Sequence, residues 1–489
     1  MIRKIRTRFA PSPTGEPHIG NAHSALFAWL FARHNNGSFI LRIEDTDVGR
    51  KVEGSVEKIM DGLRWLGIDW DEGPEVRGDY GPYFQSQRLQ LYQDAAKRLV
   101  ESGHAYYCYC SEEELEKMRA DQIARKQAPG YNRRCRDLSP ADYEARQCAS
   151  ITPVVRFKTP LTGQTKYHDV IWGNVTYENH TIDDLVLLKS DGYPTYHLAN
   201  VVDDHFMQIT HVLRAEEWIS STPRHLMLYR ALGWEPPEFA HLPMLLGPDR
   251  SKLSKRHGST SVLEFKEQGY LPEAMVNFMS LLGWSLDDKT ELITRDELVN
   301  NFTLERVSKV AGIFNHEKLK WMNGVYMRAL QPDEFVKQCL PFLEKGLPSE
   351  VKRPLSLEYV KKVLPLVHER VKLLGEVTAL THYFFRETLE YDTASLIGKD
   401  MTAESTIKAL AASREKLVSL VCFDAPTMEP ALRQLAVDLS LKAGQLFGAL
   451  RTAVSGETAT PPLFQMMEVL GRDRSFNRID AAIKKLGTN

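Results

Sequence analysis

The sequence predicts an α/β protein that ends in an all-helical region. A strand-like run, a sharp turn, a helix-like run and a second strand-like run follow one another within residues 4–47. A polar loop with two lysines and an arginine, KLSKR, comes much later, at 252–256, and amphipathic helical patterns dominate from residue 261 onward. Strand–helix–strand units form parallel sheets with right-handed crossovers. Ligands bind such sheets at the carboxyl ends of the strands, so we expect the early turn to belong to a binding site.

The turn at 8–23, RFAPSPTGEPHIGNAH, separates the strand-like run 4–9 from the helix. The chain must bend sharply there, because neither element can continue through its prolines and glycine, Pro11, Pro13, Gly15 and Pro17. The helix begins with free backbone N–H groups that suit a phosphate. The second strand-like run, 38–43, ends in EDTD, which places Glu44 at the same edge of the sheet.

The next part of the chain departs from this regular pattern. Helix-like runs at 55–66 and 89–101 flank a loop rich in turn residues. From 103 to 183 the pattern changes to short strands, loops and one charged helix, which we interpret as an insertion that splits the sheet domain. Sheet-like runs return afterwards, at 184–189, 208–214 and 242–254.

Composition sets outer bounds on the function. A chain of 489 residues is too long for one ordinary core, and 43% hydrophobic with 26% charged residues is typical of a soluble globular protein. No apolar run approaches the roughly 20 residues of a membrane span, and the N-terminal MIRKIRTRF lacks the apolar core of a signal peptide. We therefore expect a cytoplasmic protein with reduced cysteines. The net charge of −2 does not indicate a nucleic-acid partner, so any RNA contact must come from local basic patches.

Two short motifs suit phosphates. HIGN, at 18–21, lies in the early turn, but it is not a dinucleotide-binding G-x-G-x-x-G turn, and the chain has no G-x-x-x-x-G-K-[ST] loop. KLSKR, before Gly258, suits a polyphosphate chain. Each motif alone is weak, because a histidine near a helix start is usually structural and a K-x-x-K-R run is usually a solvated loop.

Together and in this order, HIGN and KLSKR resemble the signature of class I aminoacyl-tRNA synthetases. The longer strings RFAPSPTG, RIEDTD, YPTYHLANVVDDH, LRAEEW and KLSKR are similar to those of bacterial-type glutamyl-tRNA synthetases, and the resemblance covers essentially the whole chain. One departure is Asn21, where the superfamily often has a second histidine and glutamate-specific members vary. The resemblance implies a Rossmann-like nucleotide-binding domain split by an acceptor-binding insertion, followed by an all-α C-terminal anticodon-binding region.

The resemblance also implies how the domains are arranged along the chain. We expect the first half of the catalytic domain at 1–102, the insertion at 103–183, the second half at 184–250, a signature-loop and helical connecting domain at 251–330, and the anticodon-binding region at 331–489. The glutaminyl enzymes of the family end instead in β-barrels. Here the runs 432–447 and 462–470 carry apolar residues at three-to-four spacing, which favours helices.

The implied reaction is the ATP-dependent ligation of L-glutamate to tRNA(Glu) through a glutamyl-adenylate, by a monomer, with Mg²⁺ arriving on ATP. Neither step needs a protein nucleophile, so catalysis comes from positioning and from stabilising charge on phosphoryl oxygens. His18 and Lys255 are the expected catalytic residues. The expected ATP-binding residues are His18, Gly20, Glu217, Lys252, Ser254, Lys255 and Arg256.

Glutamate brings two carboxylates and an ammonium group. An arginine fork is the natural partner of a carboxylate, and Arg8 and Arg214 match the family's substrate-binding positions at strand ends. Glu44 suits the ammonium. The full set expected to bind glutamate is Arg8, Ala10, Ser12, Glu44, Tyr196, Asn200 and Arg214. Each arginine alternatively forms a structural salt bridge. Asp203, Asp204 and His205 are more typical of a structural cluster at a helix end than of metal ligands.

The insertion carries a C-x-C…C-x-D pattern formed by Cys108, Cys110, Cys135 and Asp137. These four residues are a candidate Zn²⁺ site, since tetrahedral zinc accepts thiolates and, less often, a carboxylate. Zinc-binding glutamyl enzymes are similar here, usually with a histidine where Asp137 stands. The alternative is a set of reduced cysteines packed beside tyrosines. Ser111 and Glu114 predict a capping box at the start of a helix that runs through Ile123, and Cys148 is expected to be a surface or packing residue.

The resemblance implies that the insertion grips the acceptor end of tRNA. Its basic residues near Tyr131 suit a single-stranded RNA end or form a solvated basic face: Arg125, Lys126, Arg133, Arg134 and Arg136. Three rival functions stay open. They are an enzyme that also charges tRNA(Gln) with glutamate, an enzyme that adenylylates a small molecule without RNA, and an inactive tRNA-binding paralogue.

Overall fold

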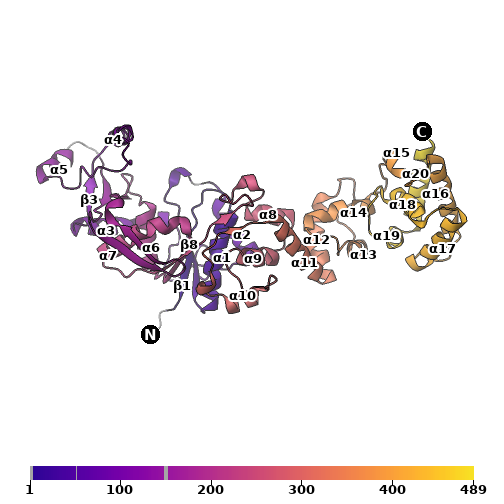
Figure 1. Ribbon diagram of the computed structural model, residues 1–489, viewed down its shortest axis with the longest axis horizontal. Helices are drawn as coiled ribbons and strands as arrows, with labels where there is room; N and C mark the ends of the chain where they lie inside the picture. Colours follow the sequence, from indigo (N-terminus) through magenta and orange to yellow (C-terminus); the bar gives the residue numbers. More distant parts are fainter. Residues whose placement is uncertain (1–3, 51, 148–151, 489) are drawn as a thin grey trace. The chain divides into compact units, whose positions relative to one another are not determined.

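The computed structural model describes residues 4–50, 52–147 and 152–488, so Cys148 lies outside the described part (Figure 1). The chain divides into two compact units. Unit 1 comprises Met1–Lys266 and Pro272–His316, and unit 2 comprises Glu267–Leu271 and Glu317–Asn489.

Unit 1 is organised around a mostly parallel sheet whose strands come from distant parts of the chain. These strands are β1 (Arg6–Phe9), β2 (Ser38–Leu41), β5 (Gln164–Asp169), β6 (Gly173–Glu178), β8 (His211–Ala215) and β9 (Glu238–Leu242). β1 pairs with β2, β8 with β9 and β9 with β5, all in parallel, while β6 pairs antiparallel with β5. β8 meets β1 where Thr210 N donates to Arg6 O at 2.9 Å. The predicted parallel α/β fold is confirmed.

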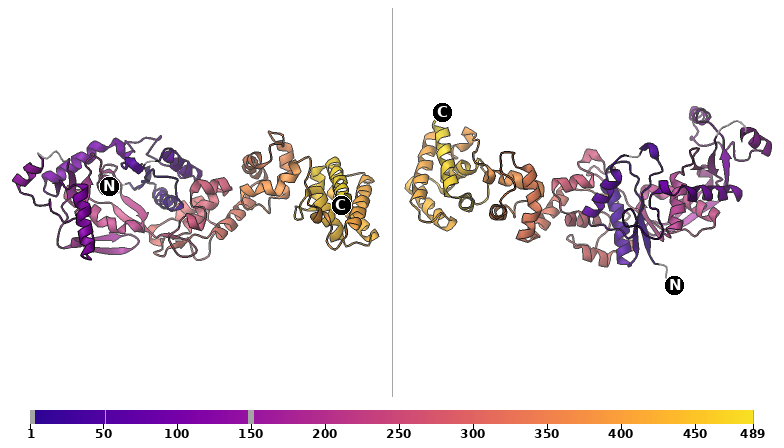
Figure 2. Two further views of the ribbon diagram at one scale, coloured as in Figure 1. Left: turned by 90° about the horizontal axis from the view of Figure 1, so that it is seen from above. Right: turned by 180° about the vertical axis from the view of Figure 1, so that it is seen from behind.

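Helices cover this sheet, as two views of the ribbon show (Figures 1 and 2). α1 (Ile19–His34) forms the predicted crossover between β1 and β2, and its residues Ile19, Leu26 and Phe27 are fully buried. The other helices of unit 1 outside the insertion are α2 (Ser55–Trp65), α3 (Leu89–Glu101), α6 (Tyr196–Phe206), α7 (Thr222–Leu232), α8 (Val262–Gln268), α9 (Pro272–Ser280) and α10 (Arg295–Asn301).

The insertion has its own small antiparallel sheet of β3 (Ala105–Cys108), β4 (Val154–Phe157) and β7 (Val186–Leu188). It also carries α4 (Glu112–Ala124) and α5 (Pro140–Gln147). The predicted capping box is confirmed, because Ser111 Oγ accepts from Glu114 N and Ser111 N donates to Glu114 Oε2. None of the residues of α4 is buried, which explains its charged sequence.

Strand pairing crosses the expected boundary at residue 183. β7, expected in the second half of the catalytic domain, pairs with β4 of the insertion, whereas β5 and β6, expected in the insertion, extend the main sheet through β9. Alternation along a short strand predicts which face is buried but not which strand is its neighbour. The expected strand at 242–254 is also divided, into the end of β9 and β10 (Leu245–Leu246), which pairs with β11 (Gly312–Ile313).

Every regular element described in unit 2 is a helix, which confirms the predicted all-α ending. These helices are α11 (His316–Ala329), α12 (Pro332–Gly346), α13 (Leu357–Val363), α14 (Val377–Phe385), α15 (Thr393–Leu396), α16 (Ala403–Val418), α17 (Ala425–Asp438), α18 (Ala443–Ser455), α19 (Leu463–Leu470) and α20 (Arg472–Gly487). Met466 and Met467 are fully buried in the core of this unit. No described helix is long and apolar enough to span a membrane.

Candidate active site

A cavity of about 460 Å³ opens at the carboxyl ends of β1, β2 and β8 and at the start of α1. The residues that line it include Arg8, Ala10, Ser12, His18, Gly20, Glu44, Tyr196, Asn200, Arg214, Glu217 and Lys252. The structure therefore brings together all seven residues expected to bind glutamate and four of those expected to bind ATP. Ser254, Lys255 and Arg256 are not in its lining.

His18 caps the first helix of the cavity wall. Its Nδ1 accepts a hydrogen bond from Gly20 N at 3.0 Å, so the neutral ring carries its proton on Nε2. Burial lowers the pKa of His18, and the nearby charges of Lys252 and Lys255 lower it further. The ring is therefore neutral near pH 7 and offers a hydrogen-bond donor rather than a charge.

The early turn and the basic loop are neighbours. His18 forms an isolated β-bridge with Ser261, and Ile19 N donates to Thr260 O at 2.8 Å. The charge of Lys255, an exposed residue of this loop, contributes to the lowered pKa of His18. Among the described residues, no hydrogen bond or ion pair holds the Lys255 side chain. Its ammonium is thus available to a ligand.

The rest of the basic loop is held by local contacts. Lys252 Nζ lies 2.5 Å from Glu217 Oε2, which joins two residues expected to bind ATP. Ser254 N donates to His257 Nδ1 at 3.1 Å, and the ring of His257 lies against Asp249. Arg256 also lies beside Asp249, with Nη2 at 3.4 Å from Oδ2. These contacts fix the backbone around Lys255 while leaving its side chain free.

Arg8 belongs to a buried ion network. Its Nε lies 3.1 Å from Asp204 Oδ1, which also receives Arg42 Nη1 at 2.6 Å, and Arg42 Nη2 reaches Glu44 Oε1 at 3.0 Å. Burial opposes ionisation of Asp204, but the two arginines outweigh it and leave the pKa of Asp204 below its ordinary value. For Glu44 burial dominates and raises the pKa, although Arg42 opposes it.

The helix-end carboxylates confirm their predicted structural role. Asp203 accepts from Arg88 Nε at 2.6 Å and from Gln85 Nε2 at 2.9 Å. With its neighbour Asp204 it completes a set in which three buried guanidinium groups face three buried carboxylates: Arg8, Arg42 and Arg88 against Glu44, Asp203 and Asp204. Because the charges balance, this network can lie in the interior without a ligand.

Arg214 is held differently. Its Nε donates to His241 Nε2 at 3.1 Å, its Nη1 to Tyr196 Oη at 3.0 Å and its Nη2 to Thr222 Oγ1 at 2.7 Å. These partners, together with Trp218 O at 3.3 Å from Nη2, are neutral acceptors, and no carboxylate within the described part of the chain pairs with Arg214. The guanidinium is only 6% exposed, so the cavity wall contains a buried cation without an adjacent anion. Such a group strongly favours an anionic ligand.

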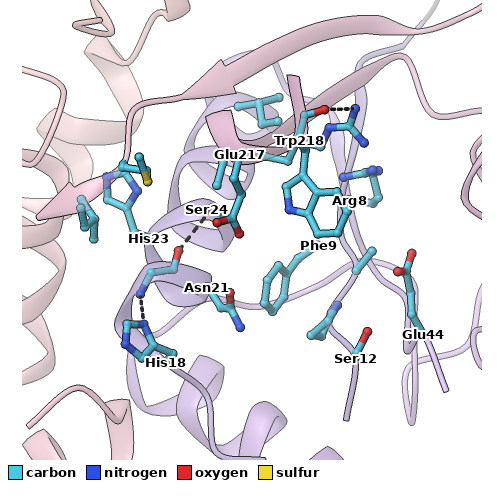
Figure 3. A pocket seen from close by; sticks show the side chains of 18 of the residues that line it. Arg8, Phe9, Ser12, His18, Asn21, His23, Ser24, Glu44, Glu217 and Trp218 are labelled. Atoms are coloured by element: carbon cyan, nitrogen blue, oxygen red, sulfur yellow. Dashed lines mark hydrogen bonds between the residues drawn. The ribbon is translucent and has the colours of Figure 1, made fainter. Parts of the chain in front are cut away.

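Aromatic rings complete the wall. Tyr196 packs on Trp218 with ring centroids 4.6 Å apart, and its other neighbours are His197 and His225. In the view of Figure 3, His18 lies on one side of the pocket and Arg8 and Glu44 on the other, with Glu217 and Trp218 between them. The two sides match the two expected ligands, nucleotide and amino acid.

The three cysteines of the insertion also come together. Their Sγ atoms lie within 4.8 Å of one another, with Cys110 and Cys135 3.6 Å apart, and Tyr131 Oη lies 3.2 Å from Cys108 Sγ. Asp137, predicted as the fourth ligand, is not brought to this group. Its carboxylate is exposed and pairs with Lys158 Nζ at 2.8 Å. Three clustered thiols, two of them buried, are a donor set that fits zinc.

The basic cluster of the insertion is partly structural. Arg133 and Arg136 both contact Asp184, at 3.3 and 2.9 Å, and Tyr131 is buried beneath the guanidinium of Arg156. These side chains support the fold of the insertion rather than present a surface. Arg125 and Lys126, at the end of α4, are exposed and are the cluster members best placed to meet RNA.

Comparison with known proteins gives the family. Residues 4–321 match the model of tRNA synthetases class I (E and Q), catalytic domain, and residues 334–483 match the anticodon binding domain. The chain belongs to the class I tRNA synthetases of the glutamate and glutamine group. This synthetase is 58% identical over 486 residues to a glutamate–tRNA ligase of Dehalococcoides mccartyi, with 99% of each chain covered.

Two further relatives span the synthetase from end to end. It is 48% identical over 489 residues to a glutamate–tRNA ligase of Moorella thermoacetica, with 100% of each chain covered. A crystal structure of a glutamate tRNA ligase from Elizabethkingia meningosepticum, in complex with its amino acid, superposes with a TM-score of 0.89 at 36% identity. That alignment covers 99% of this chain and 100% of the other.

Several residues that hold the side chains of the synthetase's cavity could not be chosen from the sequence. Arg42 lies in the RIEDTD string without a predicted role, and its partner Asp204, predicted to be structural, is 162 positions away. Thr222 and His241, which hold Arg214, lie in unremarkable stretches. The one available signal was the place of Arg42 at the start of the RIEDTD string, directly after the buried strand β2, since a buried arginine needs a partner.

Proposed function

We propose that this synthetase is a glutamate–tRNA ligase, which attaches L-glutamate to tRNA(Glu) at the expense of ATP. The observation that carries the proposal is the uncompensated guanidinium of Arg214 in a cavity that also contains Glu44 and His18. An amino acid with a side-chain carboxylate supplies the missing negative charge. The family and the names of its full-length relatives agree with this assignment.

The reaction proceeds in two displacements. An oxygen of the glutamate α-carboxylate attacks the α-phosphorus of ATP and pyrophosphate leaves, which gives glutamyl-adenylate. A hydroxyl of the terminal tRNA ribose then attacks the acyl carbon and AMP leaves. Both steps build negative charge on phosphoryl or carbonyl oxygens, so the protein assists by donors and cations placed around them.

Residue roles follow from the contacts of each side chain. His18 donates through Nε2 to an α-phosphoryl oxygen, because its Nδ1 is engaged by Gly20. Lys255, with Lys252 and Arg256, binds the β- and γ-phosphates and the departing pyrophosphate; Ser254 and Gly20 assist at the backbone. Glu217 contacts the nucleotide once Lys252 has turned to the phosphates. Mg²⁺ enters with ATP, bound mainly through phosphate oxygens.

The amino-acid side of the cavity discriminates by charge. Arg214 binds the side-chain carboxylate, Glu44 accepts the α-ammonium, and Arg8 borders the α-carboxylate. Ala10, Ser12, Tyr196 and Asn200 shape the space between them. A neutral side chain would leave Arg214 buried and unpaired, which costs several kcal/mol in an interior of low dielectric constant.

The proposal extends to the other parts of the chain. The insertion, 103–183, holds the acceptor end, and Cys108, Cys110 and Cys135 bind a structural zinc that ties its strands together. Asp137 points away from the thiols, so Tyr131 Oη or another oxygen donor is the better fourth ligand. The helical region, 331–489, reads the anticodon, and the enzyme works as a cytoplasmic monomer.

Aminoacylation of purified tRNA(Glu) and tRNA(Gln) with labelled glutamate tests the function. We expect ATP-dependent glutamyl-tRNA(Glu), and none with glutamine as substrate. Charging of tRNA(Gln) as well would identify a non-discriminating enzyme of the same kind. If neither tRNA accepts glutamate while its adenylate still forms, a small-molecule adenylylating enzyme replaces the proposal; if no pyrophosphate exchange occurs with tRNA present, the chain is an inactive paralogue.

A further inference from the structure

The buried guanidinium of Arg214 raises a physical question. Arg214 is 6% exposed and touches only neutral acceptors, so its orientation depends on how those acceptors are held. One of these acceptors, His241, is held by a buried carboxylate. His241, which accepts from Arg214 Nε, is itself 2.5 Å from Asp169 Oδ2 through Nδ1, and neither His241 nor Asp169 is exposed at all.

The sheet itself builds this row of side chains. Arg214 and His241 are direct partners in the parallel pair of β8 and β9, so their side chains leave the same face side by side. β5 is the next strand along, and Asp169 is its last residue, opposite Phe239 of β9. Three strands that are distant in sequence therefore deliver Asp169, His241 and Arg214 in one line.

Asp169 is fixed as an acceptor. Its Oδ1 receives backbone N–H groups from Ile171 at 3.0 Å and from Trp172 at 2.9 Å, while Oδ2 faces His241. Burial opposes its ionisation, but the hydrogen bonds from His241 and the backbone outweigh that and lower the pKa of Asp169. An ionised carboxylate can only accept, so the proton between the two residues sits on His241 Nδ1.

The tautomer of His241 then follows. With its proton on Nδ1, the ring presents the lone pair of Nε2 to Arg214 Nε, which donates at 3.1 Å. Thr222 Oγ1 lies 3.2 Å from the same nitrogen and accepts from Arg214 Nη2 at 2.7 Å. A ring protonated on Nε2 would direct an N–H against the N–H of Arg214. The orientation of the guanidinium therefore depends on which nitrogen of His241 carries the proton.

The contacts leave part of the guanidinium for a ligand. Nε is used by His241, and Nη2 by Thr222 and by Trp218 O at 3.3 Å. Nη1 contacts Tyr196 Oη alone among the described residues, so its second hydrogen is not engaged. If the guanidinium were turned so that Nε or Nη2 faced the cavity, the ligand would meet N–H groups that are already bonded to the protein.

We propose that Asp169 and His241 are a positioning pair that holds the guanidinium of Arg214 with Nη1 directed to the ligand. The inference rests on the proposed function, since the ligand of Nη1 is the side-chain carboxylate of glutamate. Neither residue touches the substrate. Their effect is on affinity for the amino acid, and ATP on the other side of the cavity does not depend on them.

Two substitutions of His241 separate its two contacts. The amide of His241→Asn reaches only the position of Nδ1, so it keeps a donor to Asp169 and removes the acceptor of Arg214. The longer His241→Gln reaches the position of Nε2, so its oxygen restores an acceptor for Arg214. We expect H241N to raise the KM for glutamate about 10- to 30-fold, and H241Q to recover at least a fivefold part of this loss, as the removal of a hydrogen bond to a charged group predicts. The KM for ATP stays within about twofold in both.

Asp169→Asn tests the tautomer. An asparagine amide can donate to Nδ1, which allows the proton to move to Nε2, so D169N is expected to raise the KM for glutamate about as much as H241N. In the H241Q background the same change has little further effect, because no imidazole links residue 169 to Arg214. His211→Asn in β8 is the matched control; this histidine lies on the same strand pair, outside the row, and its loss leaves both KM values unchanged.

The outcomes distinguish the inference from the function on which it rests. Suppose that Arg214→Gln impairs glutamate binding. The positioning pair is then overturned by any of three results: parallel changes in the KM values for glutamate and ATP, additive effects of D169N and H241Q, or no change in any variant. If Arg214→Gln leaves the KM for glutamate unchanged, or the wild-type enzyme forms no glutamyl-tRNA, the proposed function itself fails. Thermal unfolding of each variant identifies any that does not fold, and D169N and H241Q remain informative if H241N is lost.

Discussion

Arg8 and Arg214 are both buried arginines in one cavity, yet their removal is expected to affect different properties of the protein. Arg8→Gln leaves Asp204 with Arg42 as its sole cationic partner and unbalances the network of three arginines and three carboxylates. Arg214→Gln leaves no carboxylate without its direct partner, because the four groups that hold Arg214 are neutral acceptors. The first change therefore acts on folding stability and the second on substrate affinity.

The magnitudes follow from these contacts. Breaking a buried ion pair costs about 3–5 kcal/mol. Since Arg42 still neutralises Asp204, we expect about 2–4 kcal/mol for R8Q, which corresponds to a fall of about 4–8 °C in Tm at roughly 2 °C per kcal/mol for a domain of this size. R214Q removes a buried cation along with its hydrogen bonds, so its stability changes by about 1 kcal/mol or less. It loses one charge-assisted bond to the ligand, about 1.5–3 kcal/mol, or about 10- to 150-fold in the KM for glutamate.

Thermal unfolding and glutamate-dependent pyrophosphate exchange with tRNA present measure the two effects. Both variants are compared with Arg224→Gln, a half-buried arginine on the same helix as Thr222 that donates, among the described residues, to Ser220 O alone. If R214Q lowers Tm as far as R8Q, then Arg214 has a counter-charge that the contacts do not reveal. The argument from charge balance would then be wrong.

Three further outcomes are expected. Lys255→Ala lowers the rate of glutamate-dependent pyrophosphate exchange about 100-fold or more, because a cation at a developing phosphate charge is lost. The control Lys266→Ala, at an exposed lysine, does not change this rate. Equal rates in the wild type and both variants would exclude Lys255 from the mechanism. Protein purified without chelator contains about one zinc per chain, which Cys110→Ser lowers and the exposed Cys422→Ser leaves unchanged; metal analysis that finds no zinc in the wild type refutes the site. Burial lowers the pKa of His23 from 6.5 to about 4, so the unfolded chain binds a proton that the folded one does not, and stability falls by about 2 kcal/mol from pH 7 to pH 5. Chemical unfolding of His23→Gln measures this loss, and an equally steep pH dependence in the variant would contradict it.

Much of the fold could be predicted because its signals are local. The prolines of the early turn, the alternation of helix and strand around it, and the Ser111 capping box each depend on residues a few positions apart. Which strands share a sheet depends instead on contacts between distant segments. For that reason the pairing of β7 with the insertion and of β5 with the main sheet could not be predicted, although strands were expected in both regions.

The candidate site divides in the same way. Motif residues such as His18 and Arg214 could be chosen from strings that resemble a family, but the residues that hold them could not. Asp137 illustrates the limit. Its spacing from Cys135 suits a metal ligand, yet its exposed carboxylate pairs with Lys158, which follows β4. Spacing predicts which side chains can approach one another and not which nearer partner competes for them.

Discrimination between glutamate and glutamine then has a simple electrostatic origin. The two amino acids have nearly the same shape, so a pocket that only fits their outline separates them poorly. In this cavity Arg8 is already neutralised by Asp204, and adding a neutral or an anionic ligand beside it changes little. Arg214 lacks such a partner, so glutamate completes an ion pair that glutamine leaves open. The selectivity therefore comes from the unfavourable free energy of a buried, unpaired guanidinium in the empty pocket. A change that supplies Arg214 with a carboxylate, such as Thr222→Glu, is expected to weaken glutamate binding and to reduce the preference for glutamate over glutamine.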